Sequence, residues 1–137
     1  MRREIESVES KLLAQGALVE GLGDQAVEAL LRGDRDLARS AVARDEEIDR
    51  AEVAIEERCL GLLLNRRPRA KSMRFLAAAM KVNASLERMA DLAVNIAEAA
   101  EALAGDGGGA RDLDPEPLAD LAQQMVRESI DAFVTRD

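Results

Sequence analysis

One stretch of the chain decides the fold class: FLAAAMKVNASLERMADLAVNIAEAAEAL, from Phe75 to Leu103. Apolar residues recur in it at alternating steps of three and four, the spacing of a helix face that packs against other helices. The predicted inner positions are Phe75, Ala79, Val82, Leu86, Met89, Ala93, Ile96, Ala100 and Leu103. An unbroken run of this kind predicts one long, packed helix that begins near Pro68, a residue suited to a first helical turn.

Two earlier segments carry the same period and predict two more helices. The first runs from about Arg3 to Arg32, with these inner positions: Ile5, Val8, Leu12, Gln15, Val19, Leu22, Ala26 and Ala29. The second runs from about Arg35 to Leu64, with these inner positions: Leu37, Ala41, Ile48, Ile55, Cys59 and Leu62. Between them Gly33 predicts a helix end and Asp34 an N-cap. The sequence therefore predicts an all-α fold, with residues 1–104 forming an antiparallel three-helix bundle of long helices.

The remainder of the chain predicts part of a fourth helix. Residues 105–113 are rich in glycine and predict a flexible linker. Residues 114–137 begin with Asp-Pro, and their final part, 125–137, aligns with residues 22–34. We interpret them as the first helix of an incomplete second repeat, whose apolar stripe is expected to pack on the bundle or on another chain.

Composition excludes several functional classes. The net charge of −8 argues against general affinity for nucleic acid. No apolar run approaches the roughly 18 residues of a membrane span, the N-terminus lacks a signal-peptide core, and a single cysteine cannot form an intrachain disulfide. We therefore expect a cytoplasmic protein. Because the chain has no histidine, no nucleophile–base pair can be assembled, and we expect no enzyme activity.

Acidic residues form two bands beside the apolar stripes. On the second predicted helix Asp45, Asp49, Glu52 and Glu56 fall within about 60° of one another, and on the third Glu87, Asp91, Asn95 and Glu98 span about 80°. Carboxylate oxygens suit hard ions such as iron, manganese, magnesium or calcium. The spacing alone does not indicate a metal site. The sequence has seven pairs of acids at i, i+4, and 27 acids in 137 residues produce roughly five such pairs by chance. The alternative is a solvated acidic face, partly paired with these arginines: Arg44, Arg50, Arg58 and Arg88.

Three strings, taken in order, resemble the PhoU family of bacterial phosphate-uptake regulators. Residues 86–103, LERMADLAVNIAEAAEAL, resemble the third-helix pattern E-R-x-x-D-x-x-x-N-I-A-E of that family. Residues 44–60 resemble its second helix, and residues 68–75 resemble the start of its third. Together these matches cover most of residues 16–104, and their order is more specific than any one string.

The resemblance implies repeated three-helix bundles that hold metal clusters on their surface at (E/D)xxxD motifs. The implied metal is iron or manganese, with magnesium or calcium as alternatives. The implied ligands are the motif acids Asp45, Asp49, Glu87 and Asp91. Additional candidate ligands on the same two bands are Glu52, Glu56, Asn95 and Glu98.

The resemblance also implies a role and partners. The chain is expected to regulate phosphate uptake by contacting a phosphate transporter component and a sensor kinase, in the cytoplasm or at the inner face of the membrane. Two alternatives stay open: a cytosolic PhoU-like domain of, or accessory to, a sodium/phosphate cotransporter, and a plain helical module that forms a homodimer.

A cluster of cations surrounds Pro68. Its candidate partner-binding residues are Arg66, Arg67, Arg69 and Arg74, which suit an anionic partner or phosphate. The alternative interpretation is a solvated turn whose cations favour the C-terminal dipole of the preceding helix.

Overall fold

Three long helices make up the part of the chain that the computed structural model describes, residues 1–105 together with Gln124. They are α1 (Arg2–Arg32), α2 (Arg35–Asn65) and α3 (Ala70–Gly105), and the described residues contain no strand. The predicted all-α fold is confirmed, with the helix boundaries of α1 and α2 within one residue of those expected. The linker beyond Gly105 and the predicted fourth helix lie outside the described residues.

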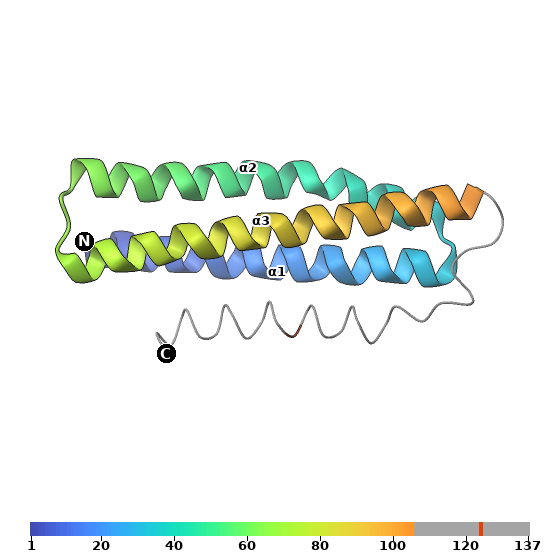
Figure 1. The fold of residues 1–137 in the computed structure, drawn as a ribbon, viewed down its shortest axis with the longest axis horizontal. Helices are drawn as coiled ribbons and strands as arrows, with labels where there is room; N and C mark the ends of the chain where they lie inside the picture. Colours follow the sequence, from blue (N-terminus) through green and yellow to red (C-terminus); the bar gives the residue numbers. More distant parts are fainter. Residues whose placement is uncertain (106–123, 125–137) are drawn as a thin grey trace.

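Consecutive helices run antiparallel, so α1 and α3 run in the same direction, and each helix contacts both of the others (Figure 1). At 1.5 Å per residue, α1 and α2 with 31 residues each are about 46 Å long, so the bundle is elongated. The N-terminus lies at the same end of the bundle as the turn between α2 and α3 (Figure 1). None of the described helices has the length and apolarity needed to cross a membrane.

The turn between α1 and α2 forms as its sequence predicts. Gly33 adopts a left-handed conformation with φ of 66°, which glycine accepts without steric cost, and its N–H donates to the carbonyl of Ala29. Asp34 then accepts a hydrogen bond on Oδ1 from the backbone N–H of Leu37 at 3.0 Å. These two caps reverse the chain within two residues.

The turn between α2 and α3 differs from its prediction. Pro68 does not lie in the first turn of α3, because that helix begins at Ala70 and the carbonyl of Arg69 accepts from the N–H of Met73 at 2.9 Å. Arg66 closes α2, and Arg67 adopts a φ of 42°. Residues 66–69 form the connection in which the chain reverses direction between α2 and α3, and Pro68 lies within it.

The core consists of small and branched aliphatic side chains. All eight inner positions predicted for α1 are buried, as are five of the six predicted for α2, with Leu37 half-buried. On α3 the most buried side chains follow two heptad rows: Leu76, Ala79, Asn83, Leu86, Ala90, Ala93, Ala97 and Ala100. The predicted seam therefore contains one of these rows, while its other members from Phe75 to Ile96 are half-buried.

For Leu103 the prediction of a core position on α3 is wrong, since the side chain is 36% exposed. Ala100 packs against Ala29 and Ala38, close to the turn where α1 ends and α2 begins. One turn beyond Ala100, little of either helix remains to cover Leu103.

Two buried amides attach α1 and α3 to α2. Gln15 donates from Nε2 to the carbonyl of Ile48 at 2.8 Å, and Asn83 donates from Nδ2 to the carbonyl of Glu52 at 2.9 Å. Both side chains are almost completely buried, so these bonds form where water does not compete. Because the two carbonyls lie one helical turn apart, the bonds fix how α1 and α3 are positioned along α2.

The burial pattern predicts a large difference between two leucines on α3. Leu86→Ala should lower the free energy of unfolding by about 2–5 kcal/mol, because Leu86 is 2% exposed and its loss leaves a cavity. Leu92→Ala, at a position that is 63% exposed, should change it by less than about 0.5 kcal/mol. Urea unfolding followed by circular dichroism measures both. Equal effects would contradict the orientation of α3.

Candidate metal centre

Acids from two helices meet where α2 packs against α3. Asp45 and Asp49 lie one turn apart on α2, and Asp91 lies opposite them on α3. One carboxylate oxygen from each of the three residues lies within 4.8 Å of the others. Asp45 is half-buried, whereas Asp49 and Asp91 are exposed. The structure thus brings together three of the four principal ligands that the sequence predicts.

Asp45 is the least exposed member of the group. Burial raises the pKa of its carboxyl, and the neighbouring carboxylates of Asp49, Asp91 and Glu87 raise it further. Its Oδ1 atom is buried, and no hydrogen-bond donor among the described residues reaches that atom. A buried carboxylate oxygen without a partner is costly, and either a proton or a cation would satisfy it.

Glu87 and Glu52 are close enough to the group for their charges to interact with it. Burial raises the pKa of Glu52, and Glu87, Glu56 and Asp49 raise it further through their negative charges. Glu87, the fourth predicted ligand, is half-buried and influences both Asp45 and Glu52. The acidic field is therefore continuous between the two residues, although Glu87 lies outside the close group of three.

The remaining predicted ligands occupy the exposed surface. Glu56 lies near Glu52 on α2, where its charge reaches that carboxyl. Asn95 and Glu98 are exposed on α3, beyond Asp91 in the direction of Gly105. Both lie outside the close group formed by Asp45, Asp49 and Asp91.

Arginine does not neutralise this group within the described part of the chain. The four arginines considered as partners are directed elsewhere: Arg44 donates to Gln25, Arg50 pairs with Glu46, Arg88 donates to Ser85, and Arg58 lines a pocket beside α1. No ion pair in residues 1–105 involves Asp45, Asp49 or Asp91. The pairing with these arginines that the alternative interpretation expects is therefore not seen in residues 1–105, whereas Asp49 and Asp91 are exposed as a solvated acidic face requires.

Gly21 explains why Arg44, the neighbour of Asp45 in sequence, turns towards α1. A Cβ atom at Gly21 would lie 3.2 Å from Nη2 of Arg44, so the glycine provides the room that the guanidinium occupies. Arg44 then donates from Nη1 to Gln25 at 2.8 Å, and Gln25 donates to the carbonyl of Leu37 at 3.1 Å. The nearest cation in sequence is thereby committed to the contact between α1 and α2.

Sequence reasoning missed Asn83. This residue begins the i, i+4, i+8 row that continues through Glu87 and Asp91, and its Oδ1 atom has no partner among the described residues. Its amide holds the backbone of Glu52, which places α2 against α3 beside the acids. The sequence does contain a signal for its burial, because Asn83 lies seven residues from both Leu76 and Ala90, in one heptad row.

The donor set fits a hard cation. All the nearby ligand atoms are carboxylate oxygens, which iron, manganese, magnesium and calcium accept. Oxygens on opposite sides of one ion lie about 4.2 Å apart for magnesium-like distances and about 4.8 Å apart for calcium. The separations in this group are at most 4.8 Å, which is compatible with three oxygens around one ion.

Comparisons with known proteins agree with this architecture. A family model described as the PhoU domain matches residues 12–100. The accessory protein PhoU homolog of the phosphate-specific transport system in Pseudomonas putida is 37% identical over 98% of this chain and 53% of its own length. The corresponding protein of Escherichia coli (strain K12) is 30% identical over 98% of this chain and 56% of its own length.

A solved structure shows the same fold. The crystal structure of PhoU from Pseudomonas aeruginosa is similar with a TM-score of 0.88 and 34% identity, covering 99% of this chain and 66% of that one. This chain spans about half the length of the curated relatives it matches.

Removing one acid should stabilise the metal-free protein. Because the pKa of Asp45 is raised, the folded state binds its proton more tightly than the unfolded state, so stability falls as pH rises through that range. Asp45→Asn should therefore raise the free energy of unfolding near neutral pH by up to about 1 kcal/mol. Thermal unfolding in the presence of a chelator measures this.

The control for that experiment is Glu47→Gln, at an exposed acid of α2 that lies outside the close group. It should leave stability nearly unchanged. A loss of stability in Asp45→Asn would mean that the carboxylate makes a favourable contact in the folded protein.

Cys59 should be protected from thiol reagents. The side chain is fully buried in the core, and burial raises the pKa of its thiol, so little of the reactive thiolate forms. Alkylation at about pH 8 should be at least tenfold slower, to an order of magnitude, in the folded protein than in urea. Ellman's reagent measures both rates, and equal rates would contradict this placement.

Proposed function

Because this chain belongs to the PhoU family, we propose that it is a regulatory accessory module of phosphate transport that holds a metal ion between α2 and α3. The observation that carries the metal proposal is the group of three carboxylates with a buried, unpartnered Oδ1 at Asp45. Support for the transport role comes from relatives named as accessory proteins of the phosphate-specific transport system, which match 98% of this chain.

Asp45, Asp49 and Asp91 would hold the ion, with Glu87 and Glu52 beside them. When bound, the cation supplies positive charge that offsets the repulsion between these acids. Since the ligands come from two helices, binding would link α2 to α3 and make the stability of the bundle depend on metal. We propose iron or manganese, with magnesium or calcium as alternatives, in line with an oxygen-only donor set.

The role that we propose is regulatory and not catalytic. The relatives are named as accessory proteins, and the chain has no histidine to act as a base. The module would work in the cytoplasm, where its partners are a component of the phosphate transporter and a sensor kinase. The homodimer and the cotransporter-linked domain stay as predictions from the sequence.

Metal analysis tests the site directly. Metal-free protein is incubated with iron or manganese, desalted and measured by elemental analysis, beside the double variant Asp45→Asn/Asp91→Asn. Wild type should retain metal and gain thermal stability, and the double variant should do neither. The matched control is Asp36→Asn/Glu47→Gln, which removes the same charge from exposed positions of α2. Equal metal retention by both double variants would overturn the site.

Partner binding tests the regulatory role separately. The purified chain, loaded with metal, is titrated against the purified ATPase of a phosphate transporter in a pull-down and by calorimetry. Saturable binding is expected. The absence of binding by a folded, metal-loaded chain would count against the proposed role while leaving the metal site intact.

A further inference from the structure

Positive charge gathers at one end of this acidic molecule. Residues 58–86 contain seven cations and no acid, although the whole chain has 27 acids and a net charge of −8. Six of the cations lie on the last turns of α2, in the connection to α3 and on the first turns of α3. These six, which we call the basic end, are Arg58, Arg66, Arg67, Arg69, Lys71 and Arg74, and all are exposed.

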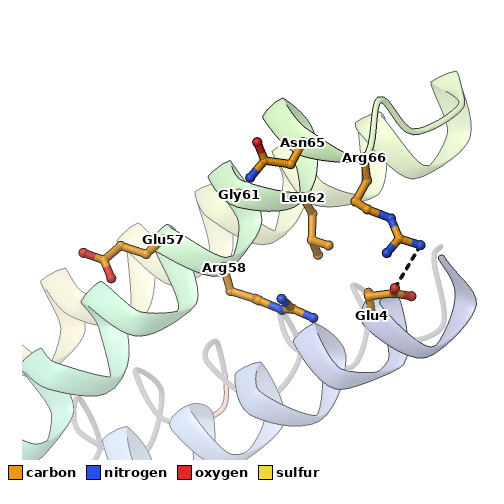
Figure 2. Close-up of a pocket in the computed structure, with 7 residues that line it drawn as sticks. All are labelled: Glu4, Glu57, Arg58, Gly61, Leu62, Asn65 and Arg66. Carbon is orange, nitrogen blue, oxygen red and sulfur yellow. Dashed lines mark ion pairs between the residues drawn. The ribbon is translucent and has the colours of Figure 1, made fainter.

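A pocket of about 220 Å³ opens between the last turns of α2 and the start of α1. Figure 2 shows Arg58 and Arg66 reaching from α2 towards α1, with Glu4 of α1 beneath Arg66, while Glu57 and Asn65 point away. Gly61 and the buried side chain of Leu62 complete the lining. The pocket therefore combines two guanidinium groups, the carboxylate of Glu4 and an apolar wall.

Two arginines and two glutamates line this pocket, and the two arginines differ in their pairing. Arg66 pairs with Glu4 at 3.2 Å, and the side chain of Arg66 is still 54% exposed. Arg58 makes no ion pair with any residue of the described chain. Guanidinium groups bind carboxylates by donating paired, charge-assisted hydrogen bonds. Arg58, which has no ion pair within the described residues, is therefore available to bind a carboxylate beside Arg66.

The backbone at Arg67 adds an independent observation. Its φ of 42° lies in the left-handed region, at the position directly after a helix end where glycine is usually found. A side chain there costs free energy that glycine would not. An arginine at this position is therefore unfavourable for folding, and a role in binding would account for its presence.

We propose that the basic end binds an acidic segment of a partner protein, with one carboxylate of that segment entering the pocket between Arg58 and Arg66. The remaining cations would contact acids on either side of it. Leu64, which is 75% exposed on the last turn of α2, is an apolar side chain available at the same end of the bundle. A flat anionic membrane would meet the outer cations but would not reach a pocket recessed between two helices, which favours a protein segment.

This surface goes beyond the proposed metal centre and does not depend on it. The pocket is formed by α1 and α2, whereas the acidic group lies between α2 and α3. Along α2, Arg58 follows Asp49 by nine residues, or about 13 Å. Because the pocket and the acidic group lie between different pairs of helices, the bundle has room for a metal ion and an acidic partner at the same time.

The experiment measures fluorescence anisotropy with a short, fluorescein-labelled peptide of glutamate and leucine. Wild type should bind it, and a peptide with glutamine in place of glutamate should not bind. Arg58→Ala should weaken binding about tenfold, the usual effect of losing one charge-assisted hydrogen bond. The matched control is Arg50→Ala, at an exposed arginine of α2 outside the basic end, which should retain the wild-type affinity. Equal losses in both variants would overturn the pocket.

Arg67→Gly separates binding from folding. The substitution relieves the left-handed strain, so thermal stability should stay equal or rise while peptide affinity falls severalfold. If affinity is unchanged, Arg67 has no part in the surface and the proposal loses its outer contacts.

Two further arms identify the class of partner. Vesicles containing anionic lipid should bind wild type and Arg58→Ala equally weakly; strong vesicle binding without peptide binding would overturn the choice of a protein partner. The variant Asp45→Asn/Asp91→Asn, which tests the metal site, should bind the peptide as wild type does. Failure of the metal proposal is thereby distinguished from failure of this one.

Discussion

Close packing of α2 against α3 places like charges together, and the candidate metal centre depends on this constraint. Rows of alanine and leucine bring the helix backbones near one another, and the amide of Asn83 holds α3 to the backbone of α2. Acids that flank these rows then meet across the contact. The apolar core provides the free energy that keeps them there, because no arginine within residues 1–105 neutralises the close group.

The sequence predicted the bundle well because the helix period is a local property. Gly33 and Asp34 mark a turn through their own backbone and capping preferences, and the inner face of α1 follows from its spacing alone. Leu103 was misplaced because its burial depends on where the other two helices end. Asn83 was overlooked because a polar residue in an apolar row attracts attention only once its distant partner, the carbonyl of Glu52, is known.

The site was predictable in part for a similar reason. Spacing along one helix indicates which acids share a face, and Asp45 and Asp49 do share one. Only the register between α2 and α3 determines that Asp91 meets them, and that register is set by packing across the bundle. Arg44 shows the limit of sequence proximity, since it adjoins Asp45 in the chain yet donates to Gln25 on α1.

The division of charge along the molecule has a consequence for how partners approach. Acids dominate the face between α2 and α3, whereas the segment 58–86, which forms the end that carries the α2–α3 turn, contains cations and no acid of its own. An acidic partner is repelled by most of the surface and attracted by one end, so electrostatics would orient it before contact. A metal ion between α2 and α3 would weaken that repulsion from the acidic face. Metal occupancy would therefore influence the rate of association more than the contact in the pocket, because the pocket lies between α1 and α2 and the acidic group between α2 and α3.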